Sequence, residues 1–263
     1  MVHGGCDALL WTSLHGIACE YIEINQFESD TEPGRWYRSP SHDCYTPGSV
    51  ENRSKSTISR DMYLGLMNFI FSRKRQDLLD RTIEYGEANA WVVGDAVNII
   101  EQVSRATITP QLYNILYDMQ ELLSLGTSAN PPDLPLTENT DFRAHLDILR
   151  IYLSGKLYGG ISDGQLETLR HQAEREPLNA LYRAAYHTYT DGDQTIALEL
   201  LLKEFPFPTD RLPNNHQDFC TGYIYQRDHR AGDNDDWKPC ADDDYQLHSG
   251  TDFIFAASVL EGL

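Results

Sequence analysis

The stretch STISRDMYLGLMNFIF, residues 56–71, decides the fold class because it has the pattern of an amphipathic helix with a clear beginning. Ser59 suits the N-cap position, and Asp61 falls in the first turn, where the helix dipole favours a negative charge. The apolar residues recur at helical spacing and form one stripe: Met62, Leu66, Phe69 and Ile70. The pattern predicts a helix near residues 59–73 that carries an acid at its start.

Helical periodicity continues along the chain. It predicts further helices over residues 6–22, 75–88, 94–105, 109–125, 140–155, 162–175, 178–188, 191–206 and 249–262. The connections between them are mostly short, which favours antiparallel neighbours. We therefore predict an all-α fold with a single helical domain over residues 1–263. Its expected architecture is a set of antiparallel helical hairpins closed into an (α/α) toroid with long loops. The segments FCTGYIYQR and RWYRSP could contain two short strands.

Residues 23–57 have the composition of a long loop, and loops of this length in a compact domain are usually functional or disordered. An aromatic and basic cluster in this loop argues against disorder: Arg35, Trp36, Tyr37 and Arg38. Its rings can stack on a sugar, and its guanidinium groups can bind a carboxylate or a sulfate. Arg60 and His248, which lie near predicted helix starts, are further candidates for substrate binding. The alternative is an ordered loop that packs its aromatic side chains onto the helices.

The chain is strongly acidic, with a formal net charge of −19 and a pI near 4.7. This charge argues against nucleic acid as a partner, because phosphate binding requires a basic surface. Residues 35–60 differ, with five basic residues against two acidic ones, and we interpret them as the lining of an anion-accepting cleft or as a solvated loop of mixed charge. No apolar run approaches the roughly 20 residues that span a bilayer, so we predict no membrane insertion.

Asp61 is the leading candidate for a catalytic carboxylate. The helix start and the neighbouring Arg60 favour its ionised form, which suits a general base or a nucleophile better than a proton donor. Asp7, at the start of the first predicted helix, is the first candidate partner, and Glu20 and Asp95 are the alternatives. A polar strip at helical spacing joins Asp61 to Gly65, Asn68 and Ser72, and we interpret it as the lining of a cleft in which Gly65 lets a ligand approach. The alternative is a surface face whose acid only stabilises the helix.

The segment SRDMYLGLM, residues 59–67, resembles the helix-start motif of the family-8 glycoside hydrolases. In that motif a serine and an acidic residue precede a Tyr-Gly-Met sequence on an inner helix of an (α/α) toroid. Here the acid stands one place later, after Arg60, and is Asp61 rather than a glutamate, which turns the side chain by about 100° around the helix. The resemblance implies a carbohydrate-active enzyme with a cleft where the helix ends converge.

These observations predict an enzyme that cleaves a glycosidic bond of a polysaccharide or oligosaccharide, most simply a glycoside hydrolase with two carboxylates. Asp61 is then the base or charge stabiliser, and Asp7 its partner. One alternative is a polysaccharide lyase acting on an acidic glycan, in which an arginine neutralises the uronate and a tyrosine or histidine moves the proton. The other is a non-catalytic glycan-binding or structural module of a larger secreted or viral assembly.

The sequence indicates no cofactor. None of the common zincin, α/β-hydrolase or nucleotide-binding motifs appears. A structural Ca²⁺ ion is an alternative for the loop starting at Asp191 and Asp193 and for the acidic runs DNDDW and ADDDY, which we interpret as solvated loops.

The five cysteines contain no CxxC pair, and Cys220–Cys240 is the expected disulfide if the protein is exported. No signal-peptide pattern opens the sequence, so either the protein stays in the cell or the sequence is a mature or excised domain. We favour an extracellular or virion-associated location over a cytoplasmic one.

Overall fold

The structure is a computed structural model that describes residues 8–19, 21–40, 58–97, 103–125, 144–175, 180–190, 194–204 and 251–262. The chain divides into two compact units. Unit 1 contains Met1–Pro132 and Leu153–Gly159, and unit 2 contains Asp133–Tyr152 and Gly160–Leu263. The described residues are mostly helical, which confirms the predicted all-α class. The toroid and the single domain stay predictions.

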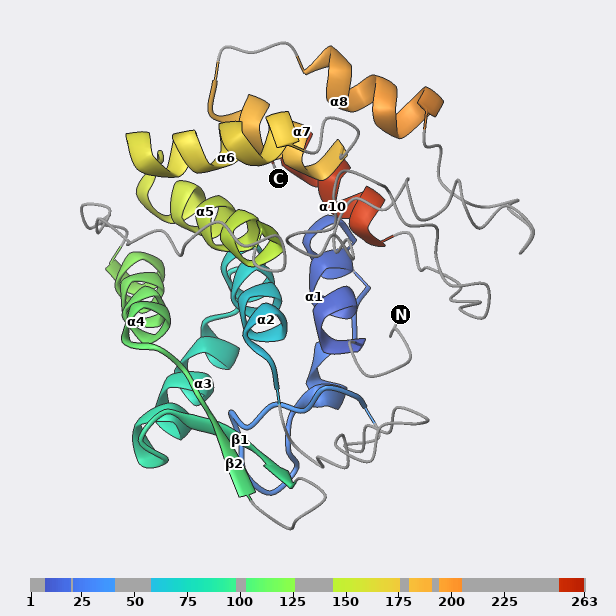
Figure 1. Cartoon of the computed structure of the whole chain (residues 1–263). Helices are drawn as coiled ribbons and strands as arrows, with labels where there is room; N and C mark the ends of the chain where they lie inside the picture. Colours follow the sequence, from blue (N-terminus) through green and yellow to red (C-terminus); the bar gives the residue numbers. More distant parts are fainter. Residues whose placement is uncertain are drawn as a thin grey trace. The chain divides into compact units, whose positions relative to one another are not determined.

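The helices of unit 1 are α1 (Ala8–Ala18), the short 3₁₀ helix η1 (Ile24–Phe27), α2 (Arg60–Ser72), α3 (Gln76–Ala88) and α4 (Pro110–Leu125) (Figure 1). Strands β1 (Val92–Val97) and β2 (Val103–Thr107) lie between α3 and α4 in the sequence. Helix α5 (Ala144–Tyr158) runs from unit 2 into unit 1. Unit 2 also contains α6 (Asp163–Arg175), α7 (Ala180–Thr188), α8 (Thr195–Glu199) with its π-helical continuation η4 (Leu200–Glu204), and α10 (Thr251–Leu260). Each predicted helix is found at its place except 94–105.

An antiparallel β-hairpin replaces the helix that we predicted over residues 94–105. Asp95 pairs with Arg105 near its centre, and the register shifts between Val92 and Gly94. The chain cannot continue as a helix after α3 because Ala90 and Trp91 both adopt left-handed backbone conformations, with φ of 50° and 61°. Valine-rich strands then follow, which suit a pleated, half-buried surface.

The Trp91 side chain ties this hairpin to the two flanking helices. Its ring stacks on Tyr113 of α4, with ring centroids 4.9 Å apart, and Tyr117 meets it edge-on at 5.8 Å. Gly86 of α3 lies against the indole so closely that a Cβ there would stand 2.4 Å from Trp91 Cε3. Since one side of the indole is stacked on Tyr113 and the ring also packs against Gly86, Trp91 is a packing residue of unit 1.

Helices α1 and α2 form the core of unit 1. Every residue from Met62 to Ile70 is buried, as is most of α1, and a helix that is buried all round belongs to the interior of a fold. Their backbones approach closely through two glycines. A Cβ at Gly65 would lie 2.7 Å from Leu10 Cδ1, and a Cβ at Gly16 would lie 2.5 Å from Phe69 Cε2.

These paired contacts also give the relative direction of α1 and α2. Leu10 meets Gly65 and, further along both helices, Gly16 meets Phe69 and accepts a hydrogen bond of 2.6 Å from Arg73 Nε. The two helices therefore run in the same direction, and their starts lie at the same end. This pair departs from the antiparallel neighbours that we predicted for helices joined by short connections, and α1 and α2 are not joined by one, since residues 19–59 separate them in the sequence.

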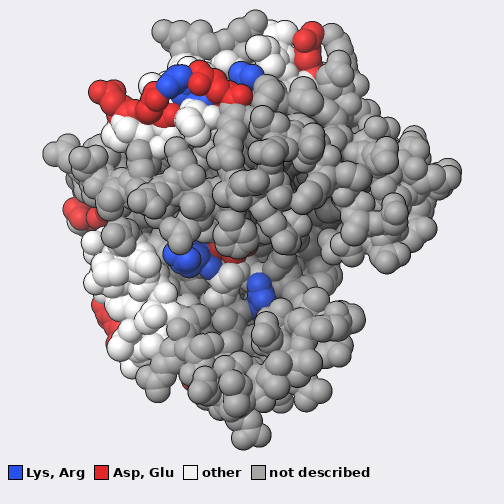
Figure 2. Space-filling model, viewed as in Figure 1, with Lys and Arg blue, Asp and Glu red and all other residues white. Residues whose placement is uncertain are grey.

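Unit 2 packs α7 against α10 and α6. The Thr188 hydroxyl lies 3.2 Å from the Val259 carbonyl of α10, and the rings of Tyr152 and Phe255 meet edge-on with centroids 5.5 Å apart. On the face that Figure 2 shows, acidic and basic side chains lie close together over α6, where Arg170 pairs with Glu167 and Glu174. Across the described ranges, no helix combines the length and apolar character needed to cross a membrane.

Candidate functional site

The predicted substrate-binding cluster lies in an ordered loop of residues 28–38, called the RWYR loop below. The backbone N–H of Ser29 donates to the Arg35 carbonyl at 2.9 Å, and the N–H of Tyr37 donates to the Phe27 carbonyl at 2.8 Å. Glu28 and Trp36 form an isolated antiparallel bridge, which is all the strand structure that RWYRSP contains. The loop is therefore a small hairpin with defined hydrogen bonds.

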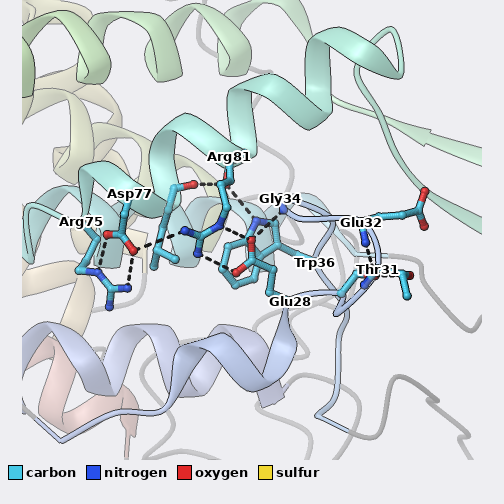
Figure 3. Close-up of polar contacts among 11 residues, drawn as sticks. Glu28, Thr31, Glu32, Gly34, Trp36, Arg75, Asp77 and Arg81 are labelled. Atoms are coloured by element: carbon cyan, nitrogen blue, oxygen red, sulfur yellow. Dashed lines mark hydrogen bonds and ion pairs between the residues drawn. The ribbon is translucent and has the colours of Figure 1, made fainter.

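A carboxylate clamps this loop onto α3 (Figure 3). Glu28 accepts two hydrogen bonds of 2.8 Å from Arg81, one from Nε and one from Nη2, in the bidentate geometry that arginine and carboxylate prefer. The backbone N–H of Gly34 donates to the same carboxylate at 2.7 Å. The hydrogen bonds with Glu28 raise the pKa of Arg81. In the first turn of α3, Asp77 accepts hydrogen bonds from Arg75, and these bonds lower the pKa of Asp77.

Trp36 is part of the core of unit 1. Its side chain is 1% exposed, and its indole N–H donates to Thr82 Oγ1 at 3.0 Å. The Thr82 hydroxyl in turn donates to the Leu78 carbonyl at 2.7 Å. A buried ring cannot stack on a sugar, so the predicted substrate-binding role of Trp36 is wrong. For this residue the alternative of a loop packed onto a helix is correct.

The other members of the cluster remain accessible to different degrees. Arg35 donates to Glu32, and its guanidinium lies 5.5 Å from the centroid of the Tyr37 ring in a cation–π arrangement. Arg38 is half-buried, and its carbonyl accepts a 3.0 Å hydrogen bond from the backbone N–H of Leu9. The end of the RWYR loop is therefore fastened to the first turn of α1.

Asp61 is half-buried at the start of α2. Ser59 occupies the N-cap position, as predicted, with φ of −87° and ψ of 166°, but its hydroxyl caps no backbone N–H. It donates instead to the Asp61 carboxylate. Arg60 is exposed and forms no ion pair with another residue that the structure describes. The carboxylate at this helix start thus has a hydroxyl partner and a neighbouring cation.

The polar strip beyond Asp61 does not line a cleft as we predicted. Gly65 faces Leu10 of α1 rather than a ligand, and Asn68 is 1% exposed and donates to the Leu64 carbonyl at 2.9 Å. The physical reason is that a glycine without a Cβ allows two helices to approach as well as it allows a ligand to approach. The strip is therefore a helix-packing surface.

The same packing sets the end of unit 1 at which the start of α2 lies. Residues four apart lie on one face of a helix, so Asp61 and Gly65 share the face that meets α1. Since α1 and α2 are parallel, Asp61 lies toward the first turn of α1, where the Arg38 carbonyl is bound. We call this region the helix-start end, formed by Leu9, Arg38, Ser59 and Asp61. Both helix dipoles have their positive ends there.

Several predicted residues lie outside the described part of the chain. These are Asp7, His248, Cys220, Cys240 and the acidic segments considered for Ca²⁺. Cys19 is a free cysteine. Among the described side chains, no three histidine, cysteine or acidic groups gather closely enough to hold a metal ion.

Sequence reasoning missed the residues that fix the site in place. Glu28 and Arg81 are 53 positions apart, and Trp36 and Thr82 are 46 apart. Opposite charge is the only signal that the first pair carries in the sequence, and many other pairs share it. No family model, curated protein or solved structure matches this chain.

Proposed function

We propose that this chain is a carbohydrate-active enzyme that cleaves a glycosidic bond of a polysaccharide at the helix-start end. One observation carries the proposal. The parallel packing of α1 and α2 at Leu10 and Gly65 brings Asp61 to the end where the RWYR loop is fastened. In this proposal the carboxylate works with the cationic and phenolic side chains of the loop, a combination that suits an oxocarbenium-like transition state and the recognition of sugar hydroxyl groups.

In this proposal Asp61 acts as the base or as the stabiliser of positive charge on the sugar. The Ser59 hydroxyl orients the Asp61 carboxylate by donating a hydrogen bond to one of its oxygens. The other oxygen is then available for the substrate or a water molecule. Arg35, Tyr37, Arg38 and Arg60 are the proposed binding residues. Asp7, which precedes Ala8 in the sequence, stays the proposed second carboxylate, and His248 stays a proposed binding residue.

A screen with neutral and uronate-containing polysaccharides tests this function. Hydrolysis releases reducing ends alone, whereas a lyase also forms an unsaturated product that absorbs in the ultraviolet. On the substrate that responds, we expect Asp61→Asn to lower kcat by about 10²- to 10⁴-fold. The matched control is Asp163→Asn, which removes another acid from the first turn of a helix, in unit 2. Unchanged turnover in Asp61→Asn would reject the proposed role.

A polysaccharide lyase on an acidic glycan is the second candidate. The observation that favours it is the cation–π pair of Arg35 and Tyr37, because a lyase needs a cation for the uronate and a group such as a phenol to move the proton. The ultraviolet product separates this candidate from the hydrolase. Binding of a glycan without release of any product would instead favour the non-catalytic module.

A further inference from the structure

We propose that Glu28 and Arg81 are positioning residues of the helix-start end. The proposed function assigns no role to either residue. This inference deepens that function, and its meaning for catalysis rests on it. The ion pair between Glu28 and Arg81 fixes the RWYR loop on α3, and the loop in turn sets the position of Arg38 against the first turn of α1. Loss of the ion pair at Glu28 should therefore loosen the hydrogen bond between Arg38 and Leu9 at the other end of the loop.

The contacts form a continuous path from α3 to α1. Arg81 holds Glu28 through two hydrogen bonds of 2.8 Å, and the bridge between Glu28 and Trp36 joins the two arms of the loop. From there the chain continues through Tyr37, whose N–H is bound by the Phe27 carbonyl, to the Arg38 carbonyl. That carbonyl accepts the Leu9 N–H at 3.0 Å.

The tip of the loop packs directly against α3. Gly34 has φ of 84°, and a Cβ there would lie 1.9 Å from the Arg81 carbonyl oxygen, so the loop backbone rests directly on the backbone of α3. The Glu28 side chain is 10% exposed, whereas Glu32 in the same loop is 45% exposed in its pair with Arg35. Ion pairs at the surface contribute little, but Glu28 is largely buried and also accepts the Gly34 N–H, so Glu28→Gln removes a bidentate contact that holds the loop. Arg81 is 33% exposed and keeps Asp77 as a second partner at 3.6 Å, so the effect of the variant falls mainly on the loop.

Amide hydrogen exchange of the full chain tests the path, with Glu28→Gln as the variant and Glu32→Gln as the matched control in the same loop. We expect Glu28→Gln to speed exchange of the Tyr37 and Leu9 amides by about tenfold, since bonds to charged groups exceed ordinary hydrogen bonds in strength. Exchange of both amides should be unchanged in Glu32→Gln. An unchanged Leu9 amide in Glu28→Gln would overturn the inference, because the loop would then not transmit the loss of the pair.

Arg81→Lys is the second variant, should Glu28→Gln fail to fold. Lysine keeps the charge but cannot form the bidentate contact, so the same faster exchange at Leu9 is expected. On a cleaved polysaccharide, Glu28→Gln should raise KM while kcat changes less, because binding groups move and Asp61 does not. A fall in kcat/KM that comes from kcat alone, with KM unchanged, would contradict a positioning role. If Asp61→Asn is fully active but the Leu9 amide exchanges faster in Glu28→Gln, the proposed function fails and the path from α3 to α1 stands.

Discussion

At the scale of single residues, Asp61 shows how one acid is subject to several constraints. It lies in the first turn of α2, it accepts the Ser59 hydroxyl, and it shares a helix face with Gly65, which packs on α1. A charge that only stabilised the helix dipole would need none of these neighbours. Whether Asp61 is catalytic is therefore decided by the turnover of Asp61→Asn rather than by its effect on helix stability.

Gly34 supports the first stability prediction. Replacing it with alanine forces a side chain into a left-handed conformation and into a position 1.9 Å from the Arg81 carbonyl oxygen. We expect Gly34→Ala to lower the free energy of unfolding by about 3 kcal/mol, the sum of backbone strain and overpacking. Chemical denaturation measures this difference.

Gly159→Ala is the control for that prediction. Gly159 has φ of 72°, similar to Gly34, but no atom lies within 4 Å of the position that its Cβ would take. It carries the conformational cost without the clash, and we expect a loss of about 1 kcal/mol. Equal losses in the two variants would show that the RWYR loop can move away from α3, which would also weaken the positioning role of Glu28.

At the scale of elements, local signals in the sequence predicted α2 well and the hairpin badly. Residues 60–72 follow a serine at the N-cap position, carry an apolar stripe and contain no proline, so local propensity and tertiary structure agree despite Gly65. Residues 92–107 contain short apolar runs that fit a helix or a strand. What decides between them is the left-handed backbone at Trp91 and its ring packing on Tyr113, and that partner lies on the next helix.

The aromatic cluster beside this hairpin gives a prediction about a pKa. Tyr117 donates to Glu87 at 2.7 Å, and this hydrogen bond raises the pKa of Tyr117 to about 12 from an ordinary value of 10.0. The native state then holds the phenolic proton more tightly than the unfolded state. The resulting stabilisation is complete below pH 10 and is lost as the pH rises through about 12.

Ultraviolet titration of phenolate measures this pKa as the difference between the wild type and Tyr117→Phe. In a Glu87→Gln background we expect the midpoint of Tyr117 to fall toward 10, because the carboxylate that holds the proton is gone. Glu84→Gln, which removes an exposed acid from the same helix, is the control and should leave the midpoint unchanged. A midpoint that is the same in Glu87→Gln and the wild type would show that burial, not this hydrogen bond, controls Tyr117.

At the scale of the whole molecule, the helical class followed from the sequence because periodicity is a local property, repeated in every segment. The candidate site followed only in part. Asp61 and the RWYR loop were singled out by residue type, but the buried position of Trp36 involves Thr82, and the parallel packing of α1 and α2 depends on two glycines. Contacts between residues that are far apart in the sequence are not encoded in the pattern of any single segment. No local pattern could therefore have predicted them.

The net charge of −19 leads to the last prediction, on the salt dependence of stability. Self-repulsion among unbalanced charges destabilises a compact state, and salt screens it as the Debye length falls from about 30 Å at 0.01 M to about 8 Å at 0.15 M. The pairs of Arg170 with Glu167 and Glu174 are exposed and contribute little, so their screening costs little. We expect the Tm to rise with NaCl, by about 2–4 °C for each kcal/mol of repulsion removed.

Two variants separate the general repulsion from the local pairs. Glu84→Gln removes an exposed negative charge and should raise the Tm at low salt more than at high salt. Glu28→Gln should lower the Tm at both salt concentrations, because its pair with Arg81 is largely buried on the carboxylate side and is screened less. A Tm that falls as NaCl is added would mean that local ion pairs outweigh the repulsion. The RWYR loop would then depend on ionic strength, and the helix-start end with it.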